Sequence, residues 1–288
     1  MNTDTLLNIK NLNKYYKDQC VLNDFNLEVK KGQVWGILGP NGSGKTTTLS
    51  IILGALQATS GKYYWNKKHC NNIGSLLSEP SFYPWLKVAT NLNIIRTLKN
   101  IKNKKCINNY LQIFDILSSK YKKAKHLSKG MQLRMSLAAA TIGNPDAIIL
   151  DEPTHGLDPK GIVTIRNIIK KLATENKAII LASHILPEIE KTCSHVLILN
   201  KGKTLLKEQL HELTNRNIFK IILDKKNHKI SSELDDNDNQ IIYKRNKTII
   251  IKSTLNIENI KQKVSLDNNN IFIIKDLEDL YLNIMEIQ

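Results

Sequence analysis

The 288-residue sequence contains no long hydrophobic run. Its longest apolar stretches, such as Ala147 to Leu150 and Ala178 to Ala182, have the length of strands. They fall far short of the roughly 18 apolar residues that a helix needs to cross a bilayer. Residues 1–11 also lack the charged and apolar regions of a signal peptide. We therefore expect a chain that does not span a membrane and that would serve one only from its cytosolic side.

Paired cysteines and clustered histidines are missing as well. The seven histidines show no metal-ligand spacing, and none of the four cysteines belongs to a CxxC pair. The cysteines lie far apart, at Cys20, Cys70, Cys106 and Cys193. This pattern predicts reduced thiols and argues against a metal or redox site built from these residues.

Acidic residues are too few to balance the basic ones, and the formal net charge is +16. Residues 1–215 carry 30 Lys and Arg against 15 Asp and Glu, whereas residues 216–288 carry 12 against 11. Many of the lysines are scattered among Asn and Ile, as in residues 99–105, which is typical of a solvated face. Attraction to the anionic inner surface of a membrane, or to nucleic acid, is the functional alternative.

Strand-like and helix-like stretches alternate along residues 1–215, which predicts a parallel sheet covered on both faces. The expected strands are 9–12, 21–29, 34–38, 147–150, 178–182 and 196–199, and the expected helices are 45–53, 86–126, 129–142, 162–174 and 187–192. Further along, strands are expected at 218–223, 241–244, 248–252 and 271–274, and helices at 257–264 and 277–287. The sequence thus predicts two domains: an α/β domain over residues 1–215 and a small α+β domain over residues 216–288.

A glycine-rich segment follows the expected strand 34–38 and leads into the helix at Lys45. It fits the pattern GxxxxGK[ST] in the strand–loop–helix context that this phosphate-binding motif requires. Its glycines let successive N–H groups turn towards phosphate oxygens, and the helix N-terminus adds positive potential. Lys45 is expected to reach the β- and γ-phosphates, and the Thr46 hydroxyl to ligate Mg²⁺. The residues predicted to bind the phosphates of ATP are Gly39, Pro40, Asn41, Gly42, Ser43, Gly44, Lys45, Thr46 and Thr47.

Two adjacent carboxylates close the apolar strand 147–150. A buried strand can end in Asp151 and Glu152 where the acids meet a cation. Asp151 is expected to orient Mg²⁺ or its water, and Glu152 to polarise the water that attacks the γ-phosphate. The alternative, a charge pair at a turn, does not account for the phosphate loop about a hundred residues earlier in the chain.

Residues 5–210 resemble the ATP-binding cassette of ABC transporters. Residues 127–132, LSKGMQ, are similar to that family's signature segment LSGGQ and stand at an expected helix N-terminus. Lys129 and Met131 depart from the family pattern. Ser128, Gly130 and Gln132 are the predicted signature residues, since the Ser128 hydroxyl, the Gly130 N–H and the helix dipole can all face a γ-phosphate. Taken alone, the segment would be only a Ser helix cap. The resemblance implies a P-loop NTPase fold with a parallel-sheet core, an antiparallel β subdomain and a helical subdomain, followed here by the α+β appendage.

Three further positions carry the resemblance. Residues 156–159, GLDP, look like the loop in which Asp158 would communicate between paired sites. His184 follows the expected strand 178–182 and resembles the histidine that contacts the γ-phosphate. Tyr16 stands where the family stacks an aromatic ring on adenine, although Tyr15 beside it is an alternative.

One segment departs from the family. Ser78 stands where the family usually has a glutamine that touches Mg²⁺, and Glu79 follows it. The sequence of the segment 73–85 looks closest to that of bacterial drug and lantibiotic-immunity exporters of the bacitracin type. Its Phe82, Tyr83, Pro84 and Trp85 are expected either to pack as a loop or to form a groove for a helix of the membrane subunit.

The resemblance implies an ATPase that uses ATP and Mg²⁺ at the inner face of the cell membrane. Two cassettes would pair head to tail, as a homodimer or a heterodimer, and work with a separate permease, with export favoured over import. A soluble ABC ATPase that acts on ribosomes or nucleic acid is the alternative, although a single compact cassette gives no reason to expect a specific nucleic acid. A weakly active, nucleotide-regulated scaffold is a third possibility, kept open by Ser78 and Lys129.

Overall fold

The computed structural model describes residues 4–77, 82–104, 106–223, 239–245, 247–264 and 270–286, which form two compact units. The first unit comprises residues 1–193 and 199–204, and the second comprises residues 194–198 and 205–288. The division passes through β8 (His195–Asn200) and β9 (Lys203–Gln209). The domain boundary predicted at residue 215 lies at the end of α7 (Leu210–Asn215) and stays a prediction.

A six-stranded sheet has the strand order β5-β6-β7-β3-β8-β9, and its first four strands pair in parallel. These four are β5 (Ile73–Leu76), β6 (Ala147–Asp151), β7 (Ala178–Ser183) and β3 (Val34–Leu38). Every residue of β6, β7 and β3 is buried, as expected for parallel strands covered on both faces. Leu38 lies opposite Ser183, and Asp151 lies opposite Ala182. The carboxyl ends of the three strands therefore meet at one edge, where open α/β sheets bind their ligands.

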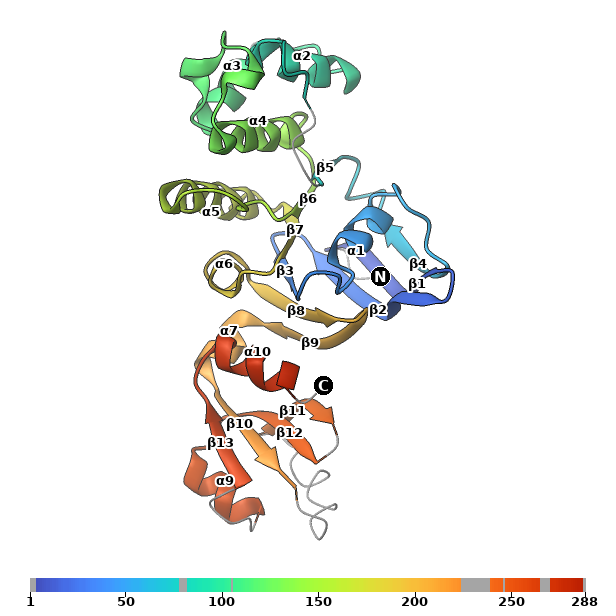
Figure 1. The fold of residues 1–288 in the computed structure, drawn as a ribbon, viewed down its shortest axis with the longest axis vertical. Coiled ribbons are helices and arrows are strands. Elements are labelled where there is room, and N and C mark those ends of the chain that lie inside the picture. Colours follow the sequence, from blue (N-terminus) through green and yellow to red (C-terminus); the bar gives the residue numbers. More distant parts are fainter. Residues whose placement is uncertain are drawn as a thin grey trace. The chain divides into compact units, whose positions relative to one another are not determined.

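Three helices flank these strands (Figure 1). α5 (Pro159–Thr174) and α6 (Leu186–Thr192) pack on one side of β7, and α1 (Lys45–Ile52) packs on the other. α5 begins three residues earlier than predicted, because Asp158 caps its N-terminus and Pro159 occupies its first position.

A second, antiparallel sheet has the order β2-β1-β4 and contains β1 (Thr5–Tyr16), β2 (Gln19–Lys30) and β4 (Ser60–Trp65). β1 and β2 form a hairpin in which Tyr16 pairs with Gln19. Lys17 takes a positive φ of 51° in the turn between them. The strand predicted at residues 9–12 is therefore part of a longer one, and β4 was not predicted.

The sequence suggested that residues 86–126 are helical throughout, but the structure divides this region. It contains α2 (Val88–Leu98), α3 (Cys106–Ile113) and two short 3₁₀ turns, η1 (Leu117–Ser119) and η2 (Ala124–His126). Asn100 and Asp115 adopt positive φ two residues beyond the last residues of α2 and α3. Asn and Asp tolerate this conformation better than most residues, and it ends a helix. With α4 (Lys129–Thr141), these helices form a separate green group next to β5 in Figure 1.

The second unit contains an antiparallel sheet with the order β11-β12-β10-β13. Its elements are β10 (Asn217–Ile222), β11 (Asn239–Arg245), β12 (Thr248–Ser253), α9 (Ile257–Val264), β13 (Ile271–Ile274) and α10 (Leu277–Glu286), which confirms the strands and helices predicted there. Phe219 and Ile221 pair with Ile251 and Ile249, and all four pack with Ile260 of α9. Lys220, which points to the opposite face, donates a hydrogen bond to Asn283 of α10. Each face of this sheet thus has its own helix.

A buried ammonium ties β12 to the segment that enters this unit. The side chain of Lys252 is 1% exposed and donates hydrogen bonds to Glu208 Oε2 at 2.7 Å and Glu212 Oε2 at 2.5 Å. Burial alone would lower the pKa of Lys252, but the two hydrogen bonds outweigh it and raise that pKa. The hydrogen bond from Lys252 lowers the pKa of Glu212.

Replacing Lys252 with methionine should lower the free energy of unfolding of this unit by about 2–3 kcal/mol, since breaking a buried ion pair strands its partners. The loss stays below that of a fully buried pair because the Glu212 side chain is 40% exposed. Hydrogen exchange of the β12 amides measures it, with Lys244→Met at an exposed position of β11 as the control. The contribution of Glu212 should be present above pH 4.5 and vanish as the pH falls through its lowered pKa. Equal protection in both variants would contradict this role of Lys252.

No helix in the described part of the chain combines the length and the apolar character that crossing a membrane requires.

Candidate active site

The loop between β3 and α1 requires glycine at particular positions. A Cβ atom on Gly39 would collide with the backbone carbonyl oxygen of Leu199. Gly44 caps α1 with a φ of 108°, and a Cβ there would lie 2.7 Å from the carbonyl oxygen of Val21. The loop therefore lies close against neighbouring strands, and any residue larger than glycine at Gly39 or Gly44 would disrupt its conformation.

Lys45, the first residue of α1, reaches back across this loop. Its Nζ donates hydrogen bonds to the carbonyl oxygens of Gly39 at 2.7 Å and Pro40 at 3.2 Å. The same ammonium lies 3.9 Å from Glu152 Oε1. Burial lowers the pKa of Lys45, although the charges of Glu152 and Asp151 counteract this. A partly desolvated ammonium at a helix N-terminus is suited to bind a phosphate.

Thr46 and Asp151 face one another from α1 and the end of β6. The Thr46 hydroxyl donates a 2.7 Å hydrogen bond to Asp151 Oδ2. Burial raises the pKa of Asp151, and the nearby charge of Glu152 adds to this, while the hydrogen bond from Thr46 opposes it. A cation beside a buried carboxylate of this kind stabilises its charged form.

Several buried oxygens here have no hydrogen-bond partner among the described residues. They are Asp151 Oδ1, Glu152 Oε2 and Ser43 Oγ. Buried polar atoms are normally paired, so such orphans mark places where a ligand supplies the partner. Mg²⁺ is typically held by only one or two protein oxygens together with water and substrate phosphates. A hydroxyl and a carboxylate already in contact, with one carboxylate oxygen free, therefore fit a magnesium–nucleotide complex.

Glu152 has a strained backbone. Its φ is 47°, in the left-handed region that a residue with a side chain adopts at a cost of about 1–3 kcal/mol. Its N–H donates to the carbonyl oxygen of Ala182 on β7, which holds the residue in place. Its Oε1 faces both Lys45 and His184. The chain therefore spends conformational energy to aim this carboxylate at the end of the sheet.

His184 follows β7 directly and lies at the same edge. Its Nδ1 donates a hydrogen bond of 2.9 Å to Glu152 Oε1, and its side chain is 40% exposed. Its imidazole also lies near that of His155, with ring centroids 6.3 Å apart. The structure thus brings Lys45, Thr46, Asp151, Glu152 and His184 together, although they come from three separate parts of the sequence.

The sequence did not reveal one pair of residues behind this cluster. The buried Thr154 hydroxyl donates a hydrogen bond to Glu188 Oε2, joining the turn after Glu152 to α6. Burial raises the pKa of Glu188, and the hydrogen bond from Thr154 counteracts this. A lone Thr and a lone Glu 34 positions apart give no pattern that could have predicted the contact.

Tyr16 lies at the end of the β1–β2 hairpin and is 48% exposed, with Lys14 Nζ 4.8 Å from its ring centroid. The same hairpin reaches the phosphate loop through Val21, whose carbonyl oxygen lies against Gly44. Tyr15 is 42% exposed and is hydrogen-bonded to Cys20, which raises its pKa. Both rings are thus exposed near the turn of the hairpin, and the stacking of Tyr16 on adenine stays a prediction.

The predicted signature residues lie elsewhere, at the N-terminus of α4. Ser128 caps this helix by accepting a hydrogen bond from the Met131 N–H at 3.3 Å. Gln132 Nε2 donates to the carbonyl oxygen of Leu127, and a Cβ on Gly130 would lie 3.3 Å from the side chain of Leu157. In Figure 1 the start of α4 belongs to the helical group, apart from α1.

Asp158, predicted to communicate between sites, caps α5 by accepting a hydrogen bond from Gly161 at 3.1 Å. Ser78 and Glu79, the pair at the position of the missing glutamine, lie outside the described residues. Cys20, Cys70, Cys106 and Cys193 are free thiols in the structure.

Comparisons with known proteins show the family of this chain. Residues 22–155 match the family model described as "ABC transporter". The bacitracin transport ATP-binding protein BcrA of Bacillus licheniformis is 38% identical over 222 residues, covering 74% of this chain and 72% of that protein. The lantibiotic transport ATP-binding protein SrtF of Streptococcus pyogenes is 34% identical over 225 residues, covering 74% of this chain and 98% of that protein.

Solved structures are similar as well. The ATP-binding cassette MJ0796, described as dimeric in a post-hydrolysis state bound to ADP and Pi, has a TM-score of 0.66 at 26% identity and covers 71% of this chain and 99% of its own. An ATP-binding subunit of an ABC transporter has the same TM-score and identity, covering 72% and 91%. The chain therefore belongs to the ABC transporter family, as an ATP-binding subunit built on an ATP-hydrolysing cassette.

Proposed function

We propose that this chain binds and hydrolyses MgATP between two paired cassettes and thereby drives export through a separate membrane permease. The observation that supports this most strongly is the cluster of Lys45, Thr46, Asp151, Glu152 and His184 with its unpartnered buried oxygens. Lys45 binds the β- and γ-phosphates, and the loop residues 39–44 other than Pro40, which has no N–H, offer N–H groups to the same phosphates. Phosphate release from MgATP by the purified chain, alone and with its permease, tests the proposal.

Glu152 orients and polarises the attacking water, because Lys45 and His184 hold its carboxylate at the phosphate end of the site. His184 would donate a hydrogen bond to the γ-phosphate. Thr46 and Asp151 would hold Mg²⁺, which neutralises phosphate charge when it is bound. Tyr16 supports the adenine from the hairpin end.

The second half of each site comes from the partner cassette. The start of α4 presents the Ser128 hydroxyl, the Gly130 N–H and a helix dipole, which together suit an anion. Because α4 lies apart from α1 in its own chain (Figure 1), these groups serve the γ-phosphate of the other copy. Asp158 follows the turn after Glu152 and communicates the state of one nucleotide site to the other. The pair is a homodimer or a heterodimer of cassettes.

Export of peptide antibiotics is the transport reaction that we favour. BcrA is named for bacitracin transport and SrtF for lantibiotic transport, at 38% and 34% identity to this chain. The chain would act at the inner face of the cell membrane, and its permease would choose the substrate.

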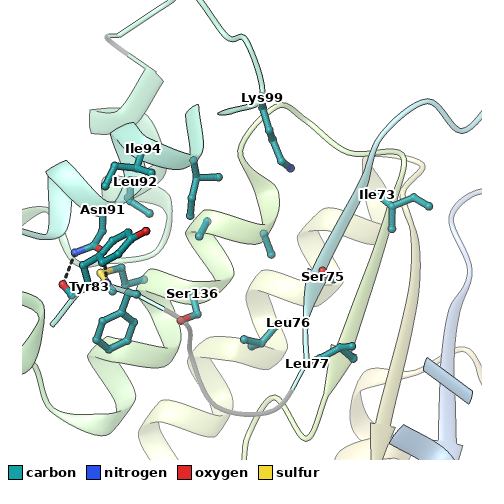
Figure 2. Close-up of a pocket in the computed structure, with 15 residues that line it drawn as sticks. Ile73, Ser75, Leu76, Leu77, Tyr83, Asn91, Leu92, Ile94, Lys99 and Ser136 are labelled. Carbon is teal, nitrogen blue, oxygen red and sulfur yellow. Dashed lines mark hydrogen bonds between the residues drawn. The ribbon is translucent and has the colours of Figure 1, made fainter. Parts of the chain in front are cut away.

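An apolar groove offers a place for the permease to bind. It has a volume of about 410 Å³ and lies between β5, α2 and α4 (Figure 2). Its walls are mainly aliphatic and aromatic, from Leu76, Leu92, Ile94, Ile95, Met135 and Phe82, and polar groups are added by Ser75, Asn91, Lys99 and Ser136. Amphipathic helices bind in grooves of this kind. We infer that a cytosolic helix of the permease lies here, which links the helical group to β5 and hence to the edge of the sheet that binds nucleotide.

A charge placed in this groove should uncouple the permease. Ile94→Asp, on the groove wall, should lower co-purification of the chain with its permease by roughly tenfold, since it buries a carboxylate in an apolar interface. Leu98→Asp is the matched control, because Leu98 is on the same helix, is 76% exposed and does not line the groove. Equal retention of the permease by both variants would show that it binds elsewhere.

A further inference from the structure

Much of the net positive charge of this chain comes from one stretch in which basic residues far outnumber acidic ones. Residues 80–145 contain 12 Lys and Arg but a single acidic residue, Asp115. Asp115 forms an ion pair with Arg134, with Oδ2 and Nη1 2.9 Å apart. Nothing in the proposed ATPase reaction uses the other lysines. These lysines are therefore free to take part in a contact that the ATPase site does not make.

Two parts of this stretch run side by side. Residues 84–89 and 120–125 are joined by backbone hydrogen bonds of 2.9–3.1 Å, and Lys87 and Lys123 form an isolated β-bridge. The bonds are Ala89 N–H to Lys120, Val88 N–H to Lys122, Ala124 N–H to Leu86 and Lys125 N–H to Pro84. Segments that are distant in sequence thus form one continuous strip.

The strip has an inner and an outer side. Val88 and Ala124 are fully buried, whereas Trp85, Lys87, residues 121–123 and Lys125 are exposed. Lys87 bridges Lys123 and has its Nζ near the Tyr121 ring. The Lys125 N–H donates to the carbonyl oxygen of Pro84, the residue before Trp85, so these exposed residues form one surface. We call it the aromatic-lysine face; it consists of Trp85, Lys87, Tyr121, Lys123 and Lys125.

Two large aromatic rings lie open on this face among ammonium groups. Trp85 is 63% exposed and Tyr121 is 71% exposed. Lys87 Nζ and Lys120 Nζ lie 5.9 Å and 5.1 Å from the centroid of the Tyr121 ring. Trp and Tyr favour the water–hydrocarbon boundary of a bilayer, where an apolar ring and a polar edge are both satisfied. Each lysine near an anionic membrane surface adds attraction.

We propose that the aromatic-lysine face binds the anionic lipid headgroups of the membrane beside the permease. The inference rests on the proposed function only in placing the chain at a membrane. Charge complementarity selects anionic lipid, since neither segment of the strip contains an acidic residue. Lysines and exposed rings also suit nucleic acid, but membership in a transporter family favours the lipid surface.

Vesicle binding by the purified full-length chain tests this proposal without the permease. The chain should co-sediment with phosphatidylglycerol–phosphatidylcholine vesicles and not with pure phosphatidylcholine, and the binding should weaken as salt is added. A Lys87→Gln, Lys123→Gln, Lys125→Gln variant should bind at least about tenfold more weakly. Lys160→Gln, Lys170→Gln, Lys171→Gln on α5 removes the same charge from another exposed surface and should bind nearly as wild type.

Trp85 supplies a local reporter. Trp35 is 6% exposed and Trp65 is half-buried, so a blue shift of the tryptophan emission on anionic vesicles reports mainly on Trp85. Trp85→Phe should abolish the shift. Vesicle binding without a shift, or equal losses in the two triple variants, would overturn the assignment of this face.

Two further outcomes would contradict the proposal. Tighter binding to single-stranded RNA than to anionic vesicles, lost in the Lys87, Lys123, Lys125 variant, would assign the face to nucleic acid. Failure to bind any vesicle, together with normal ATP hydrolysis and co-purification with the permease, would refute the lipid contact and leave the proposed function intact.

Discussion

Replacing Glu152 with glutamine is expected to slow ATP hydrolysis by roughly 10²–10⁴-fold, the usual contribution of a general base. Glutamine keeps the size of the side chain and can still accept a hydrogen bond, but it cannot take a proton from water. Lys45 and Thr46 remain in place, so nucleotide binding should persist. The paired state should then accumulate with MgATP bound, since hydrolysis is the step that opens it. Phosphate release and size-exclusion chromatography with MgATP measure the two effects.

Glu175→Gln is the matched control, because it makes the same chemical change at an exposed position just beyond the end of α5. It should hydrolyse ATP at the wild-type rate and show no enhanced pairing. Normal turnover by the Glu152 variant would mean that another group orients the water. A monomeric Glu152 variant in saturating MgATP, with and without the permease, would remove the basis for a shared site.

The parts of the site that the sequence predicted are those in which local chemistry and local structure coincide. The loop at residues 39–47 combines a strand, glycines and a helix start within one segment. Asp151 and Glu152 stand at the end of an apolar strand. In both places the residues that bind are also the residues that shape the backbone, so a pattern in the sequence carries both kinds of information.

Contacts between distant segments were not predictable in this way. The hydrogen bond between Thr154 and Glu188, and the one from the Glu152 N–H to Ala182, depend on how β6, β7 and α6 are placed beside one another. The positive φ of Glu152 also follows from this packing, since glutamate has no local preference for it. The breaks at Asn100 and Asp115 were missed because the surrounding residues alone favour a helix. The strip formed by residues 84–89 and 120–125 arises from the same kind of long-range pairing.

A mixture of two inactive variants should recover activity if each site is shared between chains. Lys45→Ala should weaken nucleotide binding by roughly 10- to 100-fold, because a hydrogen bond to a charged group contributes about 1.5–3 kcal/mol. Ser128→Asp keeps a good helix cap but places a negative charge against the γ-phosphate of the partner's nucleotide. Each variant alone should therefore hydrolyse ATP poorly.

In a mixed pair of these chains, one site carries both substitutions and the other carries neither. Random pairing of equal amounts gives mixed pairs in about half of the dimers, so roughly a quarter of the wild-type sites should be intact. The measured ATPase activity of the mixture should rise towards that level, while each variant alone stays inactive. If crosslinking detects mixed pairs and no activity returns, Ser128 does not act across the interface. Full activity of the Ser128→Asp chain alone would show that the start of α4 does not approach the phosphate at all.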